Sequence, residues 1–323
     1  MSMPLSAARK TLRSEPDRFA DDVRHYLSLT PRQLPSEYLY DELGSALFEA
    51  ICRLPWYRIT RTELELLHAH AGDILARVEP LSAVVELGPG SGDKLSTLMA
   101  AHSDREATVH LVDISPSALD AATRALNGHP QLVVVTHQAA YEHGLAEVTR
   151  AKRTAGRTLA LFLGSNIGNF DPPGADALLR DIRAALETGD ALLLGADLVK
   201  PVRDLSLAYD DPLGVTAAFN RNLLVRANGE LGADFDVDAF SHRAIWNGDA
   251  SRMEMHLVSD RRQRVRVPAS NLDITFEEGE TIWTESSYKY RTSDVVEMLD
   301  RAGFRVVEQW THEGFALTLA AAR

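Results

Sequence analysis

Five short apolar segments recur between residues 83 and 198, and helical segments lie between them. The apolar segments are 83–87, 107–115, 131–136, 158–164 and 191–198. Runs of this length that alternate with helices are typical of a parallel sheet covered on both faces. The clearest helix spans 171–188, where Asp171 can cap the first turn and Gly189 follows the last one. The sequence therefore predicts an α/β fold.

The alternation stops after residue 198 and resumes near residue 287. The segment between them mixes helical and strand patterns with turn-forming pairs such as Asn228-Gly229, which indicates an insertion or a second domain. A helix is then predicted at 293–301, followed by strands at 305–313 and 315–321. Because the turn between these strands is short, they are predicted to form an antiparallel hairpin at the end of a mostly parallel sheet.

Two helices are predicted before the first strand. Apolar residues recur every three to four positions in 36–54, and Pro55 follows this pattern. Thr60 and Glu63 have the spacing of a capping box, which predicts that a second helix begins there.

The charge of the chain limits what it can bind. Lys and Arg number 34 and Asp and Glu number 46, which gives a formal net charge of −12. Nucleic acids and anionic lipid surfaces both require a basic face, so neither is an expected partner. No segment reaches the ~20 apolar residues that span a bilayer, and no signal peptide is recognisable, which predicts a cytoplasmic protein.

Metal and disulfide chemistry are not expected from the sequence. Cys52 is the single cysteine, so an intramolecular disulfide and a zinc site built from cysteines are excluded. The eleven histidines include no H-x-x-x-H or H-E-x-x-H pair. We therefore expect no bound metal.

A glycine-rich loop follows the first apolar run. Gly88, Gly90 and Gly92 occupy alternate positions, which allows a sharp turn and a close approach of the backbone to a ligand. The spacing is G-x-G-x-G, and Asp93 stands where a dinucleotide fingerprint has its last glycine. Asp113 ends the next strand, where a carboxylate can accept hydrogen bonds from a ribose diol.

This loop and the acidic strand end resemble the S-adenosylmethionine site of Rossmann-like (class I) methyltransferases. The antiparallel hairpin at the end of the chain is similar to the last two strands of that family. An NAD-dependent oxidoreductase is an alternative, because NAD also presents a ribose to such an acid, but the glycine spacing disfavours it.

Seven segments together resemble a narrower family, the ergothioneine-pathway histidine Nα-methyltransferases. The segments are LYDELGSALFEAICRLPWYRITRTE (39–63), VVELGPGSGDK (84–94), LFLGSNIGNF (161–170), LLLGADLVK (192–200), AYDDPLGVTAAFNRNLL (208–224), ADFDVDAF (233–240) and TESSYKY (284–290). The resemblance implies a Rossmann-like methyltransferase domain, residues 60–198 and 287–323. It also implies a second, α+β substrate-binding domain, residues 12–59 and 199–286, with the active site between the two.

The resemblance assigns cofactor contacts to Gly88, Lys94 and Asp113. Asp113 suits the ribose, whereas Lys94 either pairs with the methionyl carboxylate or stabilises the loop. The family usually has an acidic residue followed by an aromatic one where adenine is held. This chain has Ala140 and Tyr141 there, so a side-chain hydrogen bond to the adenine amino group would be lost while the ring contact can remain.

Glu285 and Ser287 match the pair that binds the imidazole ring in that family. Two residues apart on an extended segment, they face the same side and can satisfy both imidazole nitrogens. Met255 matches a residue that lines the same pocket. A buried polar pair of this kind discriminates strongly against substrates that leave it unsatisfied.

The amino-acid end of the substrate is assigned to Asn169 and Tyr209, which match positions that hold the α-amino and α-carboxylate groups. Tyr57 matches a second histidine contact. Tyr40 lies where a phenol could approach the amine or the sulfonium, and Tyr40 or a water molecule is the candidate proton acceptor.

The implied activity is the transfer of three methyl groups from S-adenosylmethionine to the α-amine of L-histidine, which gives Nα-trimethylhistidine (hercynine). Two alternatives stay open at this point. The same fold could methylate another amino acid such as tryptophan, or the chain could be a non-catalytic methyltransferase-like binding protein. The expected partners are small molecules, and no obligate protein partner is evident.

Overall fold

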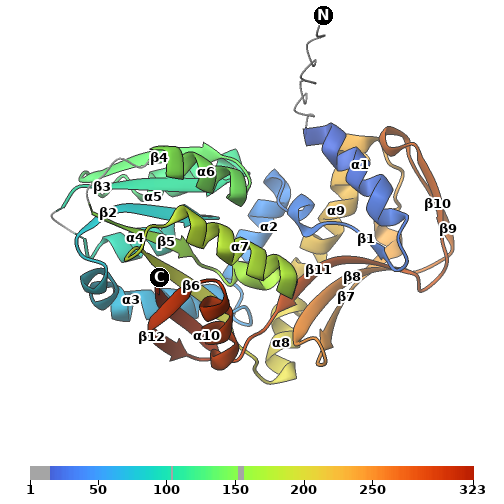
Figure 1. Ribbon diagram of the computed structural model, residues 1–323. Coiled ribbons are helices and arrows are strands. Elements are labelled where there is room, and N and C mark those ends of the chain that lie inside the picture. Colours follow the sequence, from blue (N-terminus) through green and yellow to red (C-terminus); the bar gives the residue numbers. More distant parts are fainter. Residues whose placement is uncertain (1–14, 103–104, 152–155) are drawn as a thin grey trace, which may run out of the picture.

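The computed structural model describes residues 15–102, 105–151 and 156–323 (Figure 1). Residues 12–14, which begin the predicted substrate-binding segment 12–59, lie outside the described residues. The chain forms one large and one smaller β-sheet, each with helices packed against it, and these two halves lie side by side in Figure 1.

The large sheet has seven strands in the order β12-β13-β6-β5-β2-β3-β4. The strands are β2 (Leu81–Leu87), β3 (Ala107–Asp113), β4 (Leu132–Gln138), β5 (Arg157–Phe162), β6 (Ala191–Asp197), β12 (Phe304–His312) and β13 (Phe315–Ala322). Strands β2 to β6 are parallel, whereas β13 is antiparallel to both β6 and β12. The predicted mostly parallel sheet with its C-terminal hairpin is thus confirmed.

Helices cover both faces of this sheet. Helices α3 (Ile59–Arg77), α4 (Asp93–Met99) and α5 (Pro116–Ala125) lie on one face, and α6 (Tyr141–Ala151), α7 (Pro172–Ala185) and α10 (Thr292–Arg301) on the other. Neighbouring strand residues therefore enter different cores: Val84 packs in one cluster and Val85 in the other. None of the helices in the described residues is long and apolar enough to cross a membrane.

The smaller sheet has four strands in the order β1-β11-β8-β7. Its strands are β1 (Arg32–Gln33), β7 (Phe240–Asn247), β8 (Arg252–Ser259) and β11 (Thr281–Tyr288), and a separate ribbon comprises β9 (Gln263–Val267) and β10 (Leu272–Phe276). Its remaining helices are α1 (Glu15–Leu27), α2 (Glu42–Cys52), α8 (Val202–Tyr209), α9 (Val215–Leu231) and the short 3-10 turns η1 (Ser36–Leu39), η3 (Val237–Ala239) and η4 (Pro268–Ser270).

The N-terminal segment joins this sheet directly, because β1 pairs in parallel with β11. Sequence-distant segments on either side of the predicted methyltransferase domain therefore share one sheet. The exact division into two domains stays a prediction, and β11 runs across the proposed boundary between residues 286 and 287.

Both predicted N-terminal helices are present, but two details of their prediction are wrong. The helical pattern in 36–54 is divided, because Asp41 caps a new helix at Glu42 by accepting a hydrogen bond from Gly44 N at 2.7 Å. Helix α3 begins at Ile59 without a side-chain cap, so Thr60 and Glu63 form no capping box. The carboxylate of Glu63 is buried and accepts its hydrogen bonds from Gly164 instead.

Substitution of alanine for two helical glycines is expected to change the stability of the protein in opposite directions. A Cβ at Gly44 would lie 1.7 Å from the carbonyl oxygen of Leu39, whereas a Cβ at Gly72 of α3 would meet nothing within 4 Å. Gly44→Ala is expected to destabilise the protein by about 2 kcal/mol or more. Gly72→Ala is expected to stabilise it by about 0.5–1 kcal/mol, because alanine loses less backbone entropy in a helix. Urea denaturation measures both changes, and equal shifts of the same sign would contradict the packing described here.

Candidate active site

The glycine loop leaves β2 in a conformation that favours residues without side chains. Gly88, Gly90 and Gly92 have φ angles of 72°, 55° and 80°. A Cβ at Gly88 would lie 2.8 Å from Tyr141 Oη and 2.9 Å from the side-chain nitrogen of Asn166. The loop therefore needs glycine at this point, and bare backbone faces the carboxyl end of the sheet.

The residues assigned to the cofactor by resemblance meet at this sheet edge. Asp113 ends β3 beside Gln138 of β4, and its Oδ1 accepts a hydrogen bond from Ser115 N at 2.9 Å. Burial raises the pKa of Asp113. Ala140 immediately precedes α6, whose first residue, Tyr141, directs its hydroxyl toward Gly88. Glycine backbone, a carboxylate and an aromatic ring at one edge fit a nucleoside with a ribose diol.

Lys94 has a partner inside the protein. Its ammonium lies 2.7 Å from Glu63 Oε2, and Gly164 N donates to both oxygens of Glu63, at 3.0 and 2.8 Å. The Glu63 side chain is fully buried. Helix α3, the helix after the glycine loop and the loop after β5 are thus joined by one carboxylate.

Sequence reasoning missed this role of Glu63. Its signal was available, because Glu63 lies three and four residues before Leu66 and Leu67, on the buried face of α3. An acid on such a face requires a buried partner.

Glu86 is a second buried acid near the loop. Burial raises its pKa to about 8, an effect that the nearby ammonium of Lys94 partly offsets. Its Oε2 atom has no hydrogen-bond partner among the described residues. The side chain is therefore mostly protonated and neutral at pH 7.

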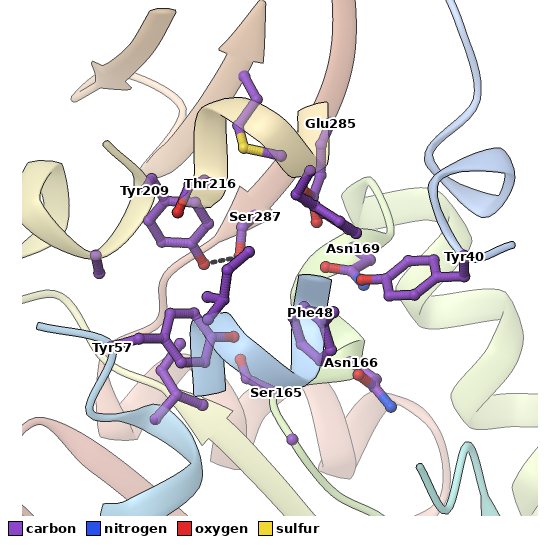
Figure 2. Close-up of a pocket in the computed structure, with 16 residues that line it drawn as sticks. Tyr40, Phe48, Tyr57, Ser165, Asn166, Asn169, Tyr209, Thr216, Glu285 and Ser287 are labelled. Carbon is purple, nitrogen blue, oxygen red and sulfur yellow. Dashed lines mark hydrogen bonds between the residues drawn. The ribbon is translucent and has the colours of Figure 1, made fainter. Parts of the chain in front are cut away.

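A pocket opens between the two sheets, beyond the end of β5 (Figure 2). Side chains from both halves of the molecule line it. They are Tyr40, Phe48, Ile51, Tyr57, Ile59, Ser165, Asn166, Asn169, Ala208, Tyr209, Thr216, Phe219, Met255, Glu285 and Ser287, with Gly164. All the residues that the sequence assigned to the substrate or to proton transfer lie in this set, whereas the cofactor residues lie at the neighbouring sheet edge.

A β-bulge directs the polar pair of β11 into the pocket. Trp283 pairs with His256 and Glu285 with Met255, so Thr284 is the extra residue on β11. Glu285 and Met255 are consequently cross-strand neighbours. Burial raises the pKa of Glu285 to about 7, although the nearby ammonium of Lys289 lowers it.

Ser287 belongs to a buried network that sequence reasoning did not find. Tyr209 Oη donates to Ser287 Oγ at 2.7 Å, the bond drawn in Figure 2. Lys289 Nζ donates to Tyr209 Oη at 2.7 Å and to Ser287 Oγ at 2.9 Å, and it lies 2.9 Å from Asp197 Oδ2. The signal was the alternation of Glu285, Ser287 and Lys289, which share one side of an extended segment.

Aromatic rings form one wall of the pocket. Tyr40 meets Phe48 and Phe219 with ring centroids 5.5 Å apart in each pair, and Phe48 lies 6.1 Å from Tyr57. Burial, and secondarily the charge of Glu285, raises the pKa of Tyr40 well above its ordinary value, so this phenol stays protonated at neutral pH. Phe48 and Phe219 were also missed, because an apolar ring on a helix is indistinguishable from core in the sequence.

Several polar side chains in the pocket form no hydrogen bond with any described residue. Within the part of the chain that the structure describes, no hydrogen bond is formed by the side chains of Tyr40, Tyr57, Asn169 or Glu285. Polar groups that line a cavity without partners are available to a ligand. The pocket thus presents two phenols, an amide and a carboxyl group to whatever it binds.

The described residues contain one group with the spacing of metal ligands, Glu65, His312 and Glu313. All three are exposed. They are already paired with protein groups, His312 with Glu65 and Glu313 with Arg58. None of them lines the pocket.

The family model described as "Histidine-specific methyltransferase, SAM-dependent" matches residues 19–323. The chain belongs to this family. It is 41% identical over 304 residues to the histidine N-alpha-methyltransferase of Mycolicibacterium smegmatis and 42% identical over 305 residues to that of Mycobacterium tuberculosis. Both alignments cover 93% of this chain, and 93% and 94% of the relatives.

A more distant relative is longer than this chain. The chain is 27% identical over 293 residues to ergothioneine biosynthesis protein 1 of Schizosaccharomyces pombe. That alignment covers 88% of this chain and 38% of the relative. The glycine loop and the pocket of this methyltransferase adjoin each other, because Asn166, which lines the pocket, lies next to Gly88.

The raised pKa of Glu86 predicts that the stability of this methyltransferase depends on pH. Its pKa is higher in the folded protein than in the unfolded chain, so the folded state holds the extra proton between about pH 4.5 and 8. This contribution to stability is complete below that range and is lost as the pH rises through it. Glu86→Gln should therefore gain on the wild type by roughly 1 kcal/mol per pH unit from pH 6 to pH 8. Urea denaturation at both pH values measures this gain.

Glu106→Gln is the matched control, because Glu106 is an exposed glutamate. It should follow the wild type at both pH values. Parallel curves for Glu86→Gln and the wild type would contradict a neutral Glu86 in the folded protein.

Proposed function

We propose that this protein transfers three methyl groups from S-adenosylmethionine to the α-amine of L-histidine, a step of ergothioneine biosynthesis. The observation that carries the proposal is the pairing of Glu285 and Ser287 at one end of a pocket whose other end adjoins the glycine loop. A carboxylate and a hydroxyl match the two nitrogens of an imidazole, and such a ligand leaves neither group unsatisfied.

The methyl donor is assigned to the edge formed by β2, β3 and β4. Gly88 would face it with backbone, Asp113 would accept hydrogen bonds from its ribose, and Tyr141 would pack on its adenine beside Ala140. Lys94 would act through Glu63, with which it is paired, by holding the loop after β5. When bound, this cofactor supplies an electrophilic methyl group on a sulfonium.

The amino-acid end of histidine is assigned to the centre of the pocket. The amide of Asn169 can donate to the α-carboxylate, and Tyr57 offers an unpaired hydroxyl nearby. Tyr209 Oη donates its hydrogen to Ser287 Oγ, so it can only accept a hydrogen bond from a ligand. An acceptor at this position suits the α-ammonium. Met255 would pack against the ring next to Glu285.

The aromatic wall suits an amine that becomes a quaternary ammonium. Each methyl transfer removes an N–H donor, so hydrogen bonds to the amine weaken as the reaction proceeds. The rings of Tyr40, Phe48 and Phe219 attract a cation whether or not it carries hydrogens. The same wall can therefore hold the amine through successive methylations.

The substrate amine must lose one proton before each methyl transfer, because only the neutral amine is a nucleophile. Three transfers convert the ammonium of histidine into a trimethylammonium and release three protons. Tyr40 is protonated at neutral pH, so we propose that it orients the amine by accepting one of its N–H groups and that water carries the proton away. Positioning of the amine then supplies much of the rate, up to roughly 7–11 kcal/mol for well-oriented reactants.

Incubation with S-adenosylmethionine and a panel of amino acids tests the proposal by mass spectrometry of the products. L-Histidine should give mono-, di- and trimethylated products, and tryptophan, whose indole cannot satisfy both Glu285 and Ser287, should give far less. Methylation of another amine without histidine would overturn the substrate. The absence of any methylated product would favour a binding protein without catalysis.

Glu285→Ala should raise the KM for histidine by roughly ten- to hundredfold, because it removes a hydrogen bond between the ligand and a charged group. The affinity for S-adenosylhomocysteine should change by less than about twofold, since Glu285 lies away from the cofactor edge. Calorimetry and initial rates measure the two effects. Glu278→Ala is the control, because Glu278 is exposed on the loop before β11. Equal losses of affinity for both ligands would sink the imidazole role of Glu285.

A further inference from the structure

Each of the three N–H groups of the Lys289 ammonium has an oxygen partner inside the protein. An ammonium has three donors and no acceptor, and Lys289 Nζ has three oxygen partners, Tyr209 Oη, Ser287 Oγ and Asp197 Oδ2. Its side chain is fully buried. Both hydroxyls must therefore accept from Lys289, whichever way their own hydrogens point.

Because Tyr209 Oη donates to Ser287 Oγ, the hydrogen of Ser287 is left to point toward the pocket. Ser287 Oγ accepts from Lys289 at 2.9 Å and from Tyr209 at 2.7 Å, which fills the two acceptor sites of a hydroxyl. Ser287 donates to no group within the residues that the structure describes. Because the side chain lines the pocket, its hydrogen is left for a ligand.

We propose that Lys289 is a positioning residue for substrate selection: it makes Ser287 an obligatory donor, so that the pocket accepts the neutral imidazole in a single tautomer. This inference rests on the proposed function. The unprotonated ring nitrogen faces Ser287, and the N–H faces the carboxylate of Glu285. An imidazolium, which carries N–H on both nitrogens, would set one of them against the Ser287 hydrogen.

Lys289 keeps its charge although it is buried. Burial alone would lower its pKa, but the charge of Asp197 and the contact with Tyr209 raise it above the ordinary value. Asp197 is bound on its other oxygen by Lys200, at 2.6 Å. Within the part of the chain that the structure describes, the other titratable groups near this cluster include Glu285 and the phenols of Tyr57 and Tyr290, and burial keeps both phenols protonated. Lys289 therefore stays a donor throughout the neutral pH range.

The protonation of the bound ring tests the proposal directly. L-Histidine labelled with ¹⁵N in the ring is bound to the full-length protein with S-adenosylhomocysteine at pH 8, above the pKa of about 7 that burial gives Glu285. The ¹⁵N chemical shifts should show one bare and one protonated nitrogen in a single tautomer, whereas the neutral ring of free histidine averages over both tautomers. Two protonated nitrogens, or an average over both tautomers, would overturn the proposal.

Lys289→Met separates positioning from structure. Ser287 then regains a free acceptor site, so the bound ring should lose its single neutral tautomer and the Kd for histidine should rise roughly ten- to hundredfold. Lys200→Met is the matched control, because Lys200 binds the same carboxylate and touches neither hydroxyl. It should keep the wild-type ¹⁵N pattern. Unchanged spectra and affinity in Lys289→Met would overturn the proposal.

Ser287→Ala answers the question if Lys289→Met fails to fold, which loss of S-adenosylhomocysteine binding would reveal. It removes the donor and leaves Lys289 paired with Asp197 and Tyr209. The single tautomer should again be lost, and its retention would refute the proposal. A wild-type protein that binds no histidine, but another amine, would instead overturn the proposed function.

Discussion

The buried ion pair between Lys289 and Asp197 joins the two halves of the molecule. Asp197 ends β6 of the large sheet, and Lys289 directly follows β11 of the smaller one. Backbone hydrogen bonds continue the junction, from Tyr290 N to Asp197 O at 3.0 Å and from Val199 N to Tyr290 O at 2.9 Å. An unpaired charge would be costly at this depth, so the two sheets are held in the arrangement that keeps the pair intact. The pocket exists because of that arrangement.

A second buried carboxylate performs the equivalent task beside the glycine loop. Glu63 binds Lys94 and Gly164 N, and a Cβ at Gly195 would lie 2.0 Å from its Oε1. It thus fixes the loop after β5, from which Ser165, Asn166 and Asn169 line the pocket. Both carboxylates are buried and ion-paired, and both hold side chains that line the pocket without lining it themselves. The arrangement of the side chains in the pocket therefore depends on residues that do not line the pocket themselves.

The sequence was sufficient for the sheet and for about half of the residues that line the pocket, among them Glu285 and Ser287. Alternating apolar runs determine a parallel sheet, and Asp171 caps α7 as predicted, because both depend on local patterns. The residues that connect distant segments were not predictable in the same way. The pairs of Lys289 with Asp197 and of Lys94 with Glu63 depend on which strands become neighbours, and the bulge at Thr284 depends on the register with β8. Family resemblance located Glu285 and Ser287, but not the ammonium of Lys289, which donates to Ser287.

The most direct test of the account is the position of the methyl groups on the product. In the proposed binding mode the imidazole lies between Glu285 and Ser287 and the α-amine faces the glycine loop, so the two ends of histidine are not interchangeable. Two-dimensional NMR of the product isolated after exhaustive reaction with ¹³C-methyl-labelled S-adenosylmethionine determines which nitrogen carries each label. The account predicts three methyl groups on the α-nitrogen and none on the ring. A methyl group on either imidazole nitrogen would contradict it.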